Sequence, residues 1–210
     1  MIRILIADDH DVVRHGLSLI LEKSGEMKVV ASCANGADTL NWLYKNDCDM
    51  ALIDIGMPGM NGIDLLKQLR KEKPKLPVLI LSSYPEDQYA VRLIKAGAAG
   101  YLNKKCAADE VVNAVHCVLG GKRHISPAVV EMLADEVSVP DGKLPHETLS
   151  NREYQIFMLL ASGKKLTEVA DILKLSVKTI GTYRSRILEK MNMHNNADMM
   201  RYVIDNNLMQ

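Results

Sequence analysis

The chain has little of several features that would narrow its function at once. Four cysteines are spread over 210 residues, with neither a CxxC pair nor a Cys/His metal pattern. We therefore expect reduced thiols, not a disulfide framework or a zinc site. The formal net charge is zero, so the chain as a whole has no electrostatic preference for nucleic acid. Neither GxGxxG nor GxxxxGK(S/T) occurs, which disfavours a nucleotide-dependent enzyme.

Long hydrophobic runs are also missing. No apolar stretch approaches the ~20 residues that cross a bilayer. The first apolar run meets Asp8 and Asp9 too early for a signal peptide. We therefore expect a cytoplasmic protein without a membrane partner.

The chain does have a regular alternation over its first 120 residues. Short runs rich in Val, Ile and Leu are separated by segments in which apolar residues recur at helical spacing. Such runs are typical of parallel strands buried on both faces, with helices covering the sheet on each side. The strands are predicted at residues 2–7, 28–33, 49–53, 77–82 and 99–103. The helices are predicted near residues 11–23, 36–46, 61–71, 86–96 and 107–119. This is an α/β fold with a doubly wound, five-stranded parallel sheet.

The pattern changes after residue 121. Ser126 and Pro127 predict the start of a short helix that ends near Val137. Residues 138–148 contain two prolines and a glycine, which is typical of a linker. All later segments have helical spacing, and their predicted bounds are 150–163, 166–173, 177–191 and 196–206. We therefore predict a first domain of residues 1–121, a short helix and linker of residues 122–148, and a small all-α domain of residues 149–210.

Polar side chains stand at the C-terminal ends of four predicted strands. Asp8 and Asp9 follow the first strand, Asp54 the third, Ser82 ends the fourth, and Lys104 follows the fifth. These ends share one edge of a parallel sheet, where such folds bind ligands. Carboxylates there can hold Mg²⁺, Asp54 can attack a phosphoryl group, and Ser82 and Lys104 can contact its oxygens. Each residue alone could equally be a helix cap, a turn residue or a surface lysine, but the coincidence favours a site.

Four segments of this first part resemble the receiver domain of two-component response regulators, namely residues 6–10, 54–62, 81–83 and 96–104. The resemblance implies a flavodoxin-like fold in which a histidine kinase phosphorylates Asp54. It implies that Mg²⁺ is bound by Asp8, Asp9, Asp54 and the backbone carbonyl of Gly56. It further implies a hydroxyl switch, an aromatic switch and a phosphate partner, at Ser82, Tyr101 and Lys104. Tyr101 could alternatively be a half-buried strand aromatic, and Lys105 stands where many receivers have proline.

The C-terminal part is locally basic. From Lys143 onward there are ten Lys/Arg and seven Asp/Glu, and residues 174–190 carry five basic side chains against the single acid Glu189. A helix that follows a tight turn and displays Lys, Arg, Thr and Ser can enter the major groove of double-stranded DNA. Its basic groups would contact phosphates and its shorter polar groups base edges. A solvated basic helix face is the alternative interpretation.

Five segments there resemble the LuxR-type helix-turn-helix, namely residues 149–153, 161–163, 168–170, 175–180 and 187–191. With the receiver, the whole chain resembles the NarL/FixJ subfamily of response regulators. The resemblance implies a recognition helix starting at Ser176 and a DNA-facing set of Lys178, Thr179, Gly181, Thr182, Tyr183, Ser185 and Arg186, to which the basic patch adds Arg184 and Lys190. Gln155 stands where the family usually has Glu. Gly181 and Thr182 replace larger side chains, so the target sequence does not carry over.

The combined prediction is a phosphorylation-controlled transcription regulator. A phosphoryl group on Asp54 would shift the receiver between two states. The family resemblance implies that the receiver otherwise masks the helical domain, and that its release would allow homodimers to bind paired half-sites. One rival is a Mg²⁺-dependent phosphohydrolase, but such enzymes usually carry a second Asp where this chain has Gly56. Another rival is a switch that acts only through protein partners, against which the basic patch argues.

Overall fold

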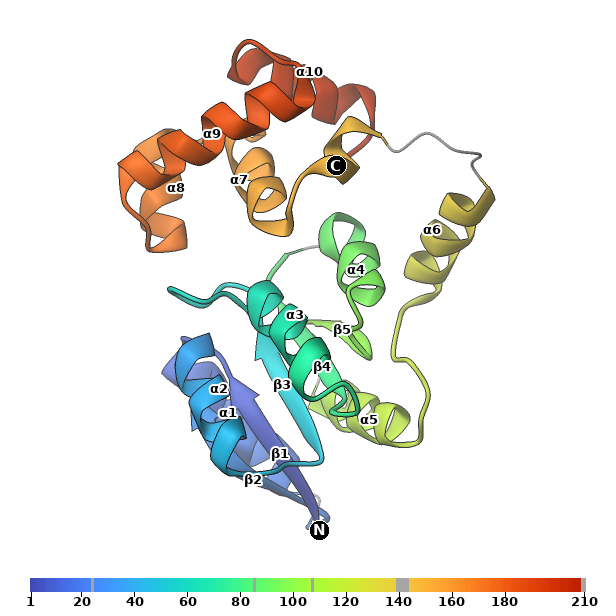
Figure 1. Cartoon of the computed structure of the whole chain (residues 1–210). Helices are drawn as coiled ribbons and strands as arrows, with labels where there is room; N and C mark the ends of the chain where they lie inside the picture. The colour runs from blue at the N-terminus through green and yellow to red at the C-terminus, as the bar shows by residue number, and fades with distance from the viewer. Residues whose placement is uncertain (24, 85, 107, 139–143, 209–210) are drawn as a thin grey trace. The chain divides into compact units, whose positions relative to one another are not determined.

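The computed structural model describes residues 1–23, 25–84, 86–106, 108–138 and 144–208. These residues form two compact units, Met1–Ala134 and Asp135–Gln210. Figure 1 shows the first unit in blue to yellow and the second in orange to red. Each unit has its own buried core, so the two are described separately.

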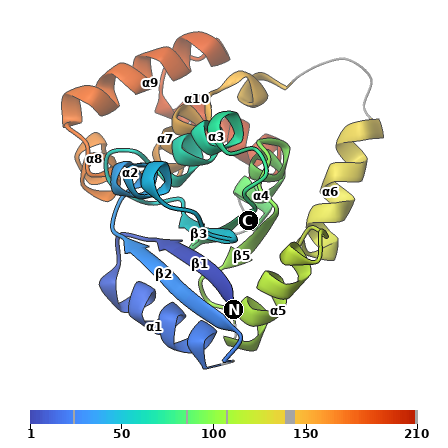
Figure 2. The same cartoon turned by 60° about the horizontal axis from the view of Figure 1, so that its bottom comes forward.

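The first unit is built on one parallel sheet. Its strands run in the order β2-β1-β3-β4-β5, and every neighbouring pair is parallel (Figures 1 and 2). The bounds are β1 Ile2–Ala7, β2 Met27–Cys33, β3 Met50–Asp54, β4 Val78–Ser82 and β5 Gly100–Asn103. All four strand-pairing contacts therefore align the C-terminal ends of the strands along one edge of the sheet.

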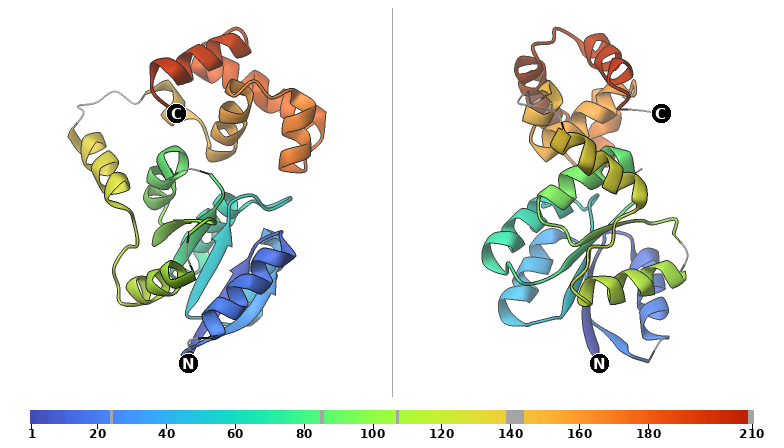
Figure 3. Two further views of the ribbon diagram at one scale, coloured as in Figure 1. Left: turned by 180° about the vertical axis from the view of Figure 1, so that it is seen from behind. Right: turned by 90° about the vertical axis from the view of Figure 1, so that its right-hand side faces the viewer.

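Helices cover both faces of this sheet. Their bounds are α1 Asp11–Glu22, α2 Gly36–Lys45, α3 Gly62–Glu72, α4 Glu86–Lys95 and α5 Ala108–Leu119, and a further helix, α6 Pro127–Ser138, follows them in the chain. α1 contacts α5, and α2 contacts α3. The right-hand view of Figure 3 shows the first pair on one side of the sheet and the second pair on the other. The predicted doubly wound α/β fold is confirmed.

The strand side chains alternate between two buried layers. Ile4, Ile6 and Leu52 belong to one cluster with Leu21 of α1 and Val115 of α5. The intervening strand residues, among them Leu5, Ile53 and Ile80, are equally inaccessible to solvent. Successive strand residues point to opposite faces, so the sheet is buried on both sides. This explains the near-continuous apolar runs in the sequence.

The second unit is all-helical. Over residues 144–208 it contains a 3-10 turn and four helices, η1 Pro145–Thr148, α7 Asn151–Ala161, α8 Leu166–Leu173, α9 Val177–Met191 and α10 Asn196–Asp205. α7 packs against α9 and α10, and α8 packs against α9. Ile156, Phe157 and Ile180 lie in its core. The expected helical bounds agree to within a residue or two at most ends.

A tight turn joins α8 to α9. Lys174 closes α8 in the left-handed conformation, at φ 53°. Two residues later Ser176 caps α9 by accepting a hydrogen bond from the backbone N–H of Thr179. One left-handed residue followed by a serine cap reverses the chain over few residues, which is the helix-turn-helix geometry expected from the sequence.

The predicted linker has more structure than expected. α6 extends to Ser138, and η1 occupies residues 145–148, while residues 139–143 lie outside the described part. Proline is excluded from helix interiors but fits the first turn, and Pro145 starts η1 there. Glu147 accepts the backbone N–H of Leu144 at 2.8 Å and closes the turn.

The described residues contain no cis peptide bond, so Lys104–Lys105 is trans.

Candidate functional site

The sheet edge brings together the polar residues at the four strand ends. Asp54 and Ser82 are the last residues of β3 and β4, while Asp8 and Lys104 come directly after β1 and β5. Asp8 and Ser82 are inaccessible to solvent and Asp54 is 4% exposed. The backbone N–H of Lys104 donates to the Ser82 carbonyl at 2.7 Å, which extends the strand pairing to the site. The expected juxtaposition is present.

The ammonium group of Lys104 bridges two carboxylates. Lys104 Nζ lies 2.6 Å from Asp8 Oδ2 and 3.1 Å from Asp54 Oδ2. The Lys104 side chain is only 11% exposed, so solvent screens these ion pairs weakly. Asp9 adds a third carboxylate to this group, and its ligand oxygen lies within 4.8 Å of those of Asp8 and Asp54. The site therefore has excess negative charge that favours a further cation.

The surroundings of the Asp54 carboxyl group disfavour its ionised form. Burial raises its pKa above the ordinary value, and the charge of Asp8 adds to the rise. The ion pair with Lys104 and the backbone N–H of Gly56 oppose the shift without cancelling it. Another cation near Asp54 would stabilise the ionised form that a nucleophile requires.

The donor set fits a divalent cation. Asp8, Asp9, His10 and Asp54 each place one ligand atom within 4.8 Å of all the others. Asp8 Oδ2 and Asp9 Oδ1 are buried and accept no hydrogen bond of good geometry from the described residues, although Lys104 Nζ lies 2.6 Å from the first and His10 Nδ1 lies 2.8 Å from the second. Carboxylate oxygens with lone pairs still available are the ligands that hard divalent ions prefer.

Glycines allow the following loop to close over Asp54. A Cβ atom at Gly62 would lie 2.0 Å from the Asp54 carbonyl oxygen, so only glycine fits at the start of α3. A Cβ at Gly56 would lie 3.2 Å from Asp54 Oδ2, a tight approach. Asn61 caps α3 by accepting the N–H groups of Ile63 and Asp64 at 2.9 Å. The loop between Asp54 and α3 is thereby fixed beside the carboxylate.

Tyr84 connects the two predicted switch residues. Its backbone N–H donates to Ser82 Oγ at 3.0 Å, and its carbonyl accepts the hydroxyl of Tyr101 at 2.8 Å. Tyr101 is 1% exposed, so its ring lies in the interior and is not the half-buried strand aromatic of the alternative interpretation. Sequence reasoning missed Tyr84 because its contribution comes from its backbone, which leaves no residue-type signal.

The predicted recognition helix presents a continuous solvent face. Lys178, Thr182, Ser185 and Arg186 are exposed, at spacings of four, seven and eight residues from the first. These spacings place them on one side of α9. Ile180, Ile187 and Met191 are buried on the opposite side. Thr179 and Gly181 flank the face and are half-buried.

Three residues of the predicted DNA-facing set are placed differently. Tyr183 and Arg184 are half-buried, and Arg184 Nε donates to Asn196 Oδ1 of α10 at 2.7 Å. Lys190 Nζ lies 2.7 Å from Glu153 Oε2 at the start of α7. Arg184 and Lys190 thus link α9 to α10 and to α7. Arg184 and Lys190 therefore differ from Lys178, Thr182, Ser185 and Arg186 in having partners on other helices, and Tyr183 differs from them in being half-buried.

Comparison with known families identifies the chain. Residues 4–116 match the response regulator receiver domain, and residues 147–203 match the bacterial regulatory proteins of the luxR family. The chain belongs to the response regulators. Response regulator UvrY of Escherichia coli K12 is 33% identical over 99% of this chain and 96% of its own length. Response regulator GacA of Pseudomonas aeruginosa is 36% identical over 95% of this chain and 94% of its own.

Solved structures agree with this assignment. RcsB of Salmonella enterica serovar Typhimurium, bound to promoter P1flhDC in the presence of phosphomimetic BeF₃⁻, is 25% identical with a TM-score of 0.65. The match covers 96% of this response regulator and 98% of that chain. The sequence prediction of a phosphorylation-controlled, DNA-binding transcription regulator with a LuxR-type helix-turn-helix is confirmed. Among the described residues, no helix is both long and apolar enough to cross a membrane.

The helical unit of this response regulator also contains a buried arginine. Arg152 Nη1 donates to Gln155 Oε1 at 2.5 Å, and Nη2 donates to the Leu173 carbonyl at 3.3 Å. Gln155 is inaccessible to solvent, and its Nε2 has no acceptor among the described residues. Gln155, which stands where the family usually has Glu, thus presents a neutral amide to the Arg152 guanidinium, whereas a carboxylate there would complement its charge.

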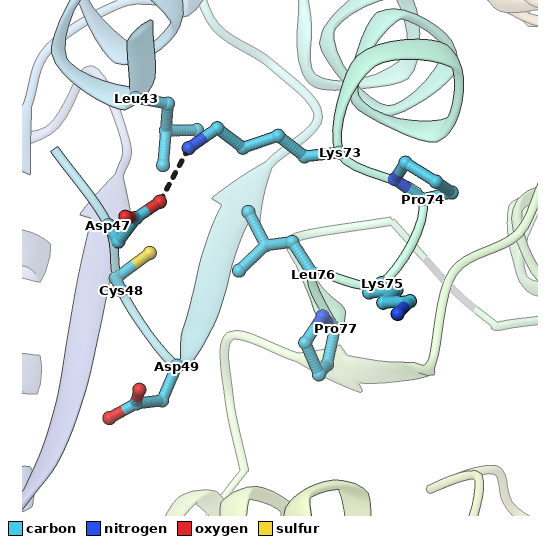
Figure 4. A pocket seen from close by; sticks show the side chains of 9 residues that line it. All are labelled: Leu43, Asp47, Cys48, Asp49, Lys73, Pro74, Lys75, Leu76 and Pro77. Carbon is cyan, nitrogen blue, oxygen red and sulfur yellow. Dashed lines mark hydrogen bonds and ion pairs between the residues drawn. The ribbon is translucent and has the colours of Figure 1, made fainter. Parts of the chain in front are cut away.

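A hollow lies at the opposite edge of the sheet from Asp54. It has a volume of about 510 Å³ and is lined by residues that precede β3 and β4, including Cys48, Asp49 and Pro77 (Figure 4). Lys73 Nζ and Asp47 Oδ1 form an ion pair across it at 2.8 Å. Burial raises the pKa of the Cys48 thiol to about 11, which keeps it protonated and unreactive at neutral pH. This hollow is separate from the Asp54 site.

Proposed function

We propose that this response regulator stores its signal as an acyl phosphate on Asp54, accepted from a histidine kinase in the presence of Mg²⁺. The observation that supports this most directly is the bridge that Lys104 forms between Asp8 and Asp54 at the sheet edge. The bridge supports the proposal because it keeps together Asp54 as the proposed nucleophile, Lys104 as the proposed partner of phosphoryl oxygens and Asp8 as a proposed cation ligand.

The transfer uses Asp54 as the nucleophile. A carboxylate oxygen of Asp54 attacks the phosphorus of a phosphohistidine, a new P–O bond forms, and the P–N bond breaks. The imidazole leaves with the bonding electron pair and takes up a proton from solvent. Mg²⁺ held by Asp8, Asp9 and Asp54, with the Gly56 carbonyl, would offset charge on the phosphoryl oxygens. Lys104, already 3.1 Å from Asp54 Oδ2, pairs with one of those oxygens.

The signal leaves the site through Ser82. The Tyr84 N–H already occupies one lone pair of Ser82 Oγ, so the hydroxyl proton remains able to donate to a phosphoryl oxygen. Movement of Ser82 would be passed to Tyr84 and, through its carbonyl, to Tyr101. The phosphoryl group then selects one of two receiver states; a shift from about 1:99 to 99:1 requires about 5.5 kcal/mol.

The output is DNA binding by α9. Lys178 and Arg186 supply positive charge for phosphates, and Thr182 and Ser185 supply shorter groups for base edges. We propose that phosphorylated chains pair as homodimers on two half-sites, with either unit providing the dimer contact. A regulator that contacts chromosomal DNA acts in the cytoplasm, which is where we place it.

Intact-mass spectrometry tests the phosphorylation step. The full chain is incubated with Mg²⁺ and a small acyl-phosphate donor, beside Asp54→Asn and the control Asp47→Asn at the opposite sheet edge. We expect one labile phosphoryl group on the wild type and on Asp47→Asn, and none on Asp54→Asn. Equal incorporation by Asp54→Asn would refute the proposed acceptor. Persistence of the group without turnover of the donor separates this regulator from a phosphohydrolase.

Gel-shift titration tests the output. Binding of the phosphorylated and unphosphorylated chain to promoter DNA is measured at several salt concentrations. We expect tighter binding after phosphorylation and a log–log salt slope set by a few phosphate contacts, each contributing about −0.9. Salt-independent retention, or none at all, would favour a switch that acts only through protein partners.

A further inference from the structure

His10 occupies an unusual position at the acidic site. Its Nδ1 lies 2.8 Å from Asp9 Oδ1 and 3.1 Å from Asp8 Oδ1. Its backbone N–H donates to Asp8 Oδ1 at 2.9 Å, which holds the residue over the two carboxylates. The imidazole is 65% exposed, whereas the Asp8 and Asp9 side chains are 0% and 20% exposed. His10 therefore forms the solvent-facing rim of an otherwise buried set of oxygens.

A helix-capping role does not explain this placement. His10 is the N-cap residue of α1, yet its side chain makes no capping hydrogen bond. The contacts that the structure gives its ring are both with aspartates of the site. A residue at a helix N-cap that turns its ring away from the helix and towards carboxylates is placed as a ligand would be.

We propose that His10 is a nitrogen ligand of the cation site and biases it towards first-row transition ions such as Mn²⁺ over Mg²⁺. This rests on the cation site of the proposed function and adds a donor to it. The Nδ1 atom and three carboxylate oxygens all lie within 4.8 Å of one another, so one ion can contact several of them after small adjustments. Imidazole suits transition ions, whereas Mg²⁺ prefers oxygen and retains its water.

The alternative is that the His10 ring only contacts the two aspartates and competes with a metal ion for their oxygens. The two possibilities predict opposite effects of removing the ring. If it is a ligand, its loss weakens Mn²⁺ selectively. If it competes with cations, its loss tightens both ions. Asn is a suitable replacement because it offers an oxygen donor and is a preferred N-cap, so α1 does not lose stability.

The test compares His10→Asn with His15→Asn, a control at an exposed histidine of α1. Calorimetric titration of the full chain with Mg²⁺ and with Mn²⁺ gives the ratio of the two dissociation constants. For His10→Asn we expect Mn²⁺ affinity to fall about tenfold or more, in the range for residues that support a metal, and Mg²⁺ affinity to change by less than about twofold. Electron spin echo modulation from ¹⁴N on bound Mn²⁺ should be present in the wild type and His15→Asn and absent in His10→Asn.

Two results would overturn the inference: no ¹⁴N modulation in the wild type, or parallel changes of both affinities in His10→Asn. Asp9→Asn separates this failure from failure of the site itself. If Asp9→Asn abolishes binding of both ions while His10→Asn changes neither, the carboxylate site stands and His10 is not a ligand. If the wild type binds neither ion, or Asp9→Asn binds both as well as the wild type, the cation site of the proposed function fails.

Discussion

The Asp54 site and the exposed face of α9 are built in opposite ways. The Asp54 site gathers side chains from four strand ends that are far apart in sequence, and it buries them around Lys104. The α9 face comes from one continuous helix, and its side chains point into solvent. Residues in the buried site constrain one another through charge and packing. The exposed side chains of the helix face are constrained mainly by the DNA that would bind there, and little by other parts of the protein.

This difference determines what each region reveals. In a buried site, an unsuitable residue destabilises the fold, so residue types alone indicate the chemistry. On an exposed face, substitutions cost the fold little, so side chains can vary with the target. The receiver chemistry can therefore be inferred in detail, whereas the DNA sequence that α9 prefers cannot. The predictions below test this contrast, from the largest expected effect to the smallest.

Removing Lys104 should have the largest effect. In Lys104→Ala, Asp8 and Asp54 remain buried without their shared cation, which should lower the free energy of unfolding by about 3 kcal/mol in chelator. Phosphoryl incorporation at Asp54 should slow by about 100-fold, as for loss of a group that stabilises developing charge. Urea unfolding followed by fluorescence of Trp42, the single tryptophan and a residue of α2, reports on the first unit.

The neighbouring Lys105→Ala is the matched control, because Lys105 is exposed. It should change stability and phosphorylation little. Millimolar Mg²⁺ should restore part of the stability lost in Lys104→Ala, since a bound cation replaces the missing charge. Equal behaviour of the two variants would mean that the buried site is no more constrained than the surface.

Two basic residues of α9 should differ in their effect on DNA binding. Arg186 is exposed and has no ion-pair partner among the described residues, whereas Lys190 pairs with Glu153. Arg186→Gln should weaken DNA binding about tenfold at low salt and reduce the magnitude of the salt slope by about one. Lys190→Gln should weaken it less. Gel-shift titrations over a salt series measure both, and a larger loss in Lys190→Gln would show that the ion pair opens on DNA.

The ion pair of Lys190 should instead affect stability, in a pH-dependent way. Burial alone would raise the pKa of Glu153, but hydrogen bonds from Lys190 and Ser150 outweigh it and hold the pKa below its usual range. An acid with a lowered folded-state pKa stabilises the fold above its unfolded pKa of about 4.3, and that contribution is lost as the pH falls through the lowered value.

Lys190→Gln should therefore lower the free energy of unfolding of the helical unit by about 1 kcal/mol at pH 7. The difference in this free energy between variant and wild type should become smaller under acid conditions. Far-UV circular dichroism reports on both units and Trp42 fluorescence on the first only, so comparing the two isolates the helical unit. If the difference in unfolding free energy between Lys190→Gln and the wild type is the same at neutral and acid pH, the contact with Glu153 does not stabilise the unit.

Several features could be predicted from sequence for physical reasons. Apolar runs predict the strands because the sheet is buried on both faces, and parallel strands align Asp54, Ser82 and Lys104 at one edge. Tyr84 could not be predicted, because its backbone makes the connection. The partners of Lys190 and Arg184 could not be predicted either, since a basic residue on a helix looks the same whether it faces DNA or another helix.

The Tyr101 hydroxyl should contribute modestly. Tyr101→Phe removes the 2.8 Å hydrogen bond to the Tyr84 carbonyl and leaves that carbonyl its longer contact with Asn103 Nδ2 at 3.4 Å. We expect a loss of about 1 kcal/mol in the unfolding of the first unit, measured by Trp42 fluorescence. Tyr44→Phe is the control, because its hydroxyl contacts Glu72 at the exposed surface. Equal losses in the two variants would show that burial of the Tyr101 hydroxyl has no special effect.

Gln155→Glu is the one substitution here for which we expect a gain in stability. In Gln155→Glu, a carboxylate would face Arg152 in place of an amide whose Nε2 has no acceptor among the described residues. The stronger charge-assisted hydrogen bond should exceed the cost of desolvating the new carboxylate, for a net gain of about 1 kcal/mol in the helical unit. Gln155→Met keeps the size but removes the acceptor, and should destabilise the same unit. Hydrogen–deuterium exchange of α7 peptides measures both variants in the full chain, and we expect slower exchange in Gln155→Glu and faster exchange in Gln155→Met. Faster exchange in both would mean that the Arg152 charge is already balanced, and that the amide is the better partner in this protein.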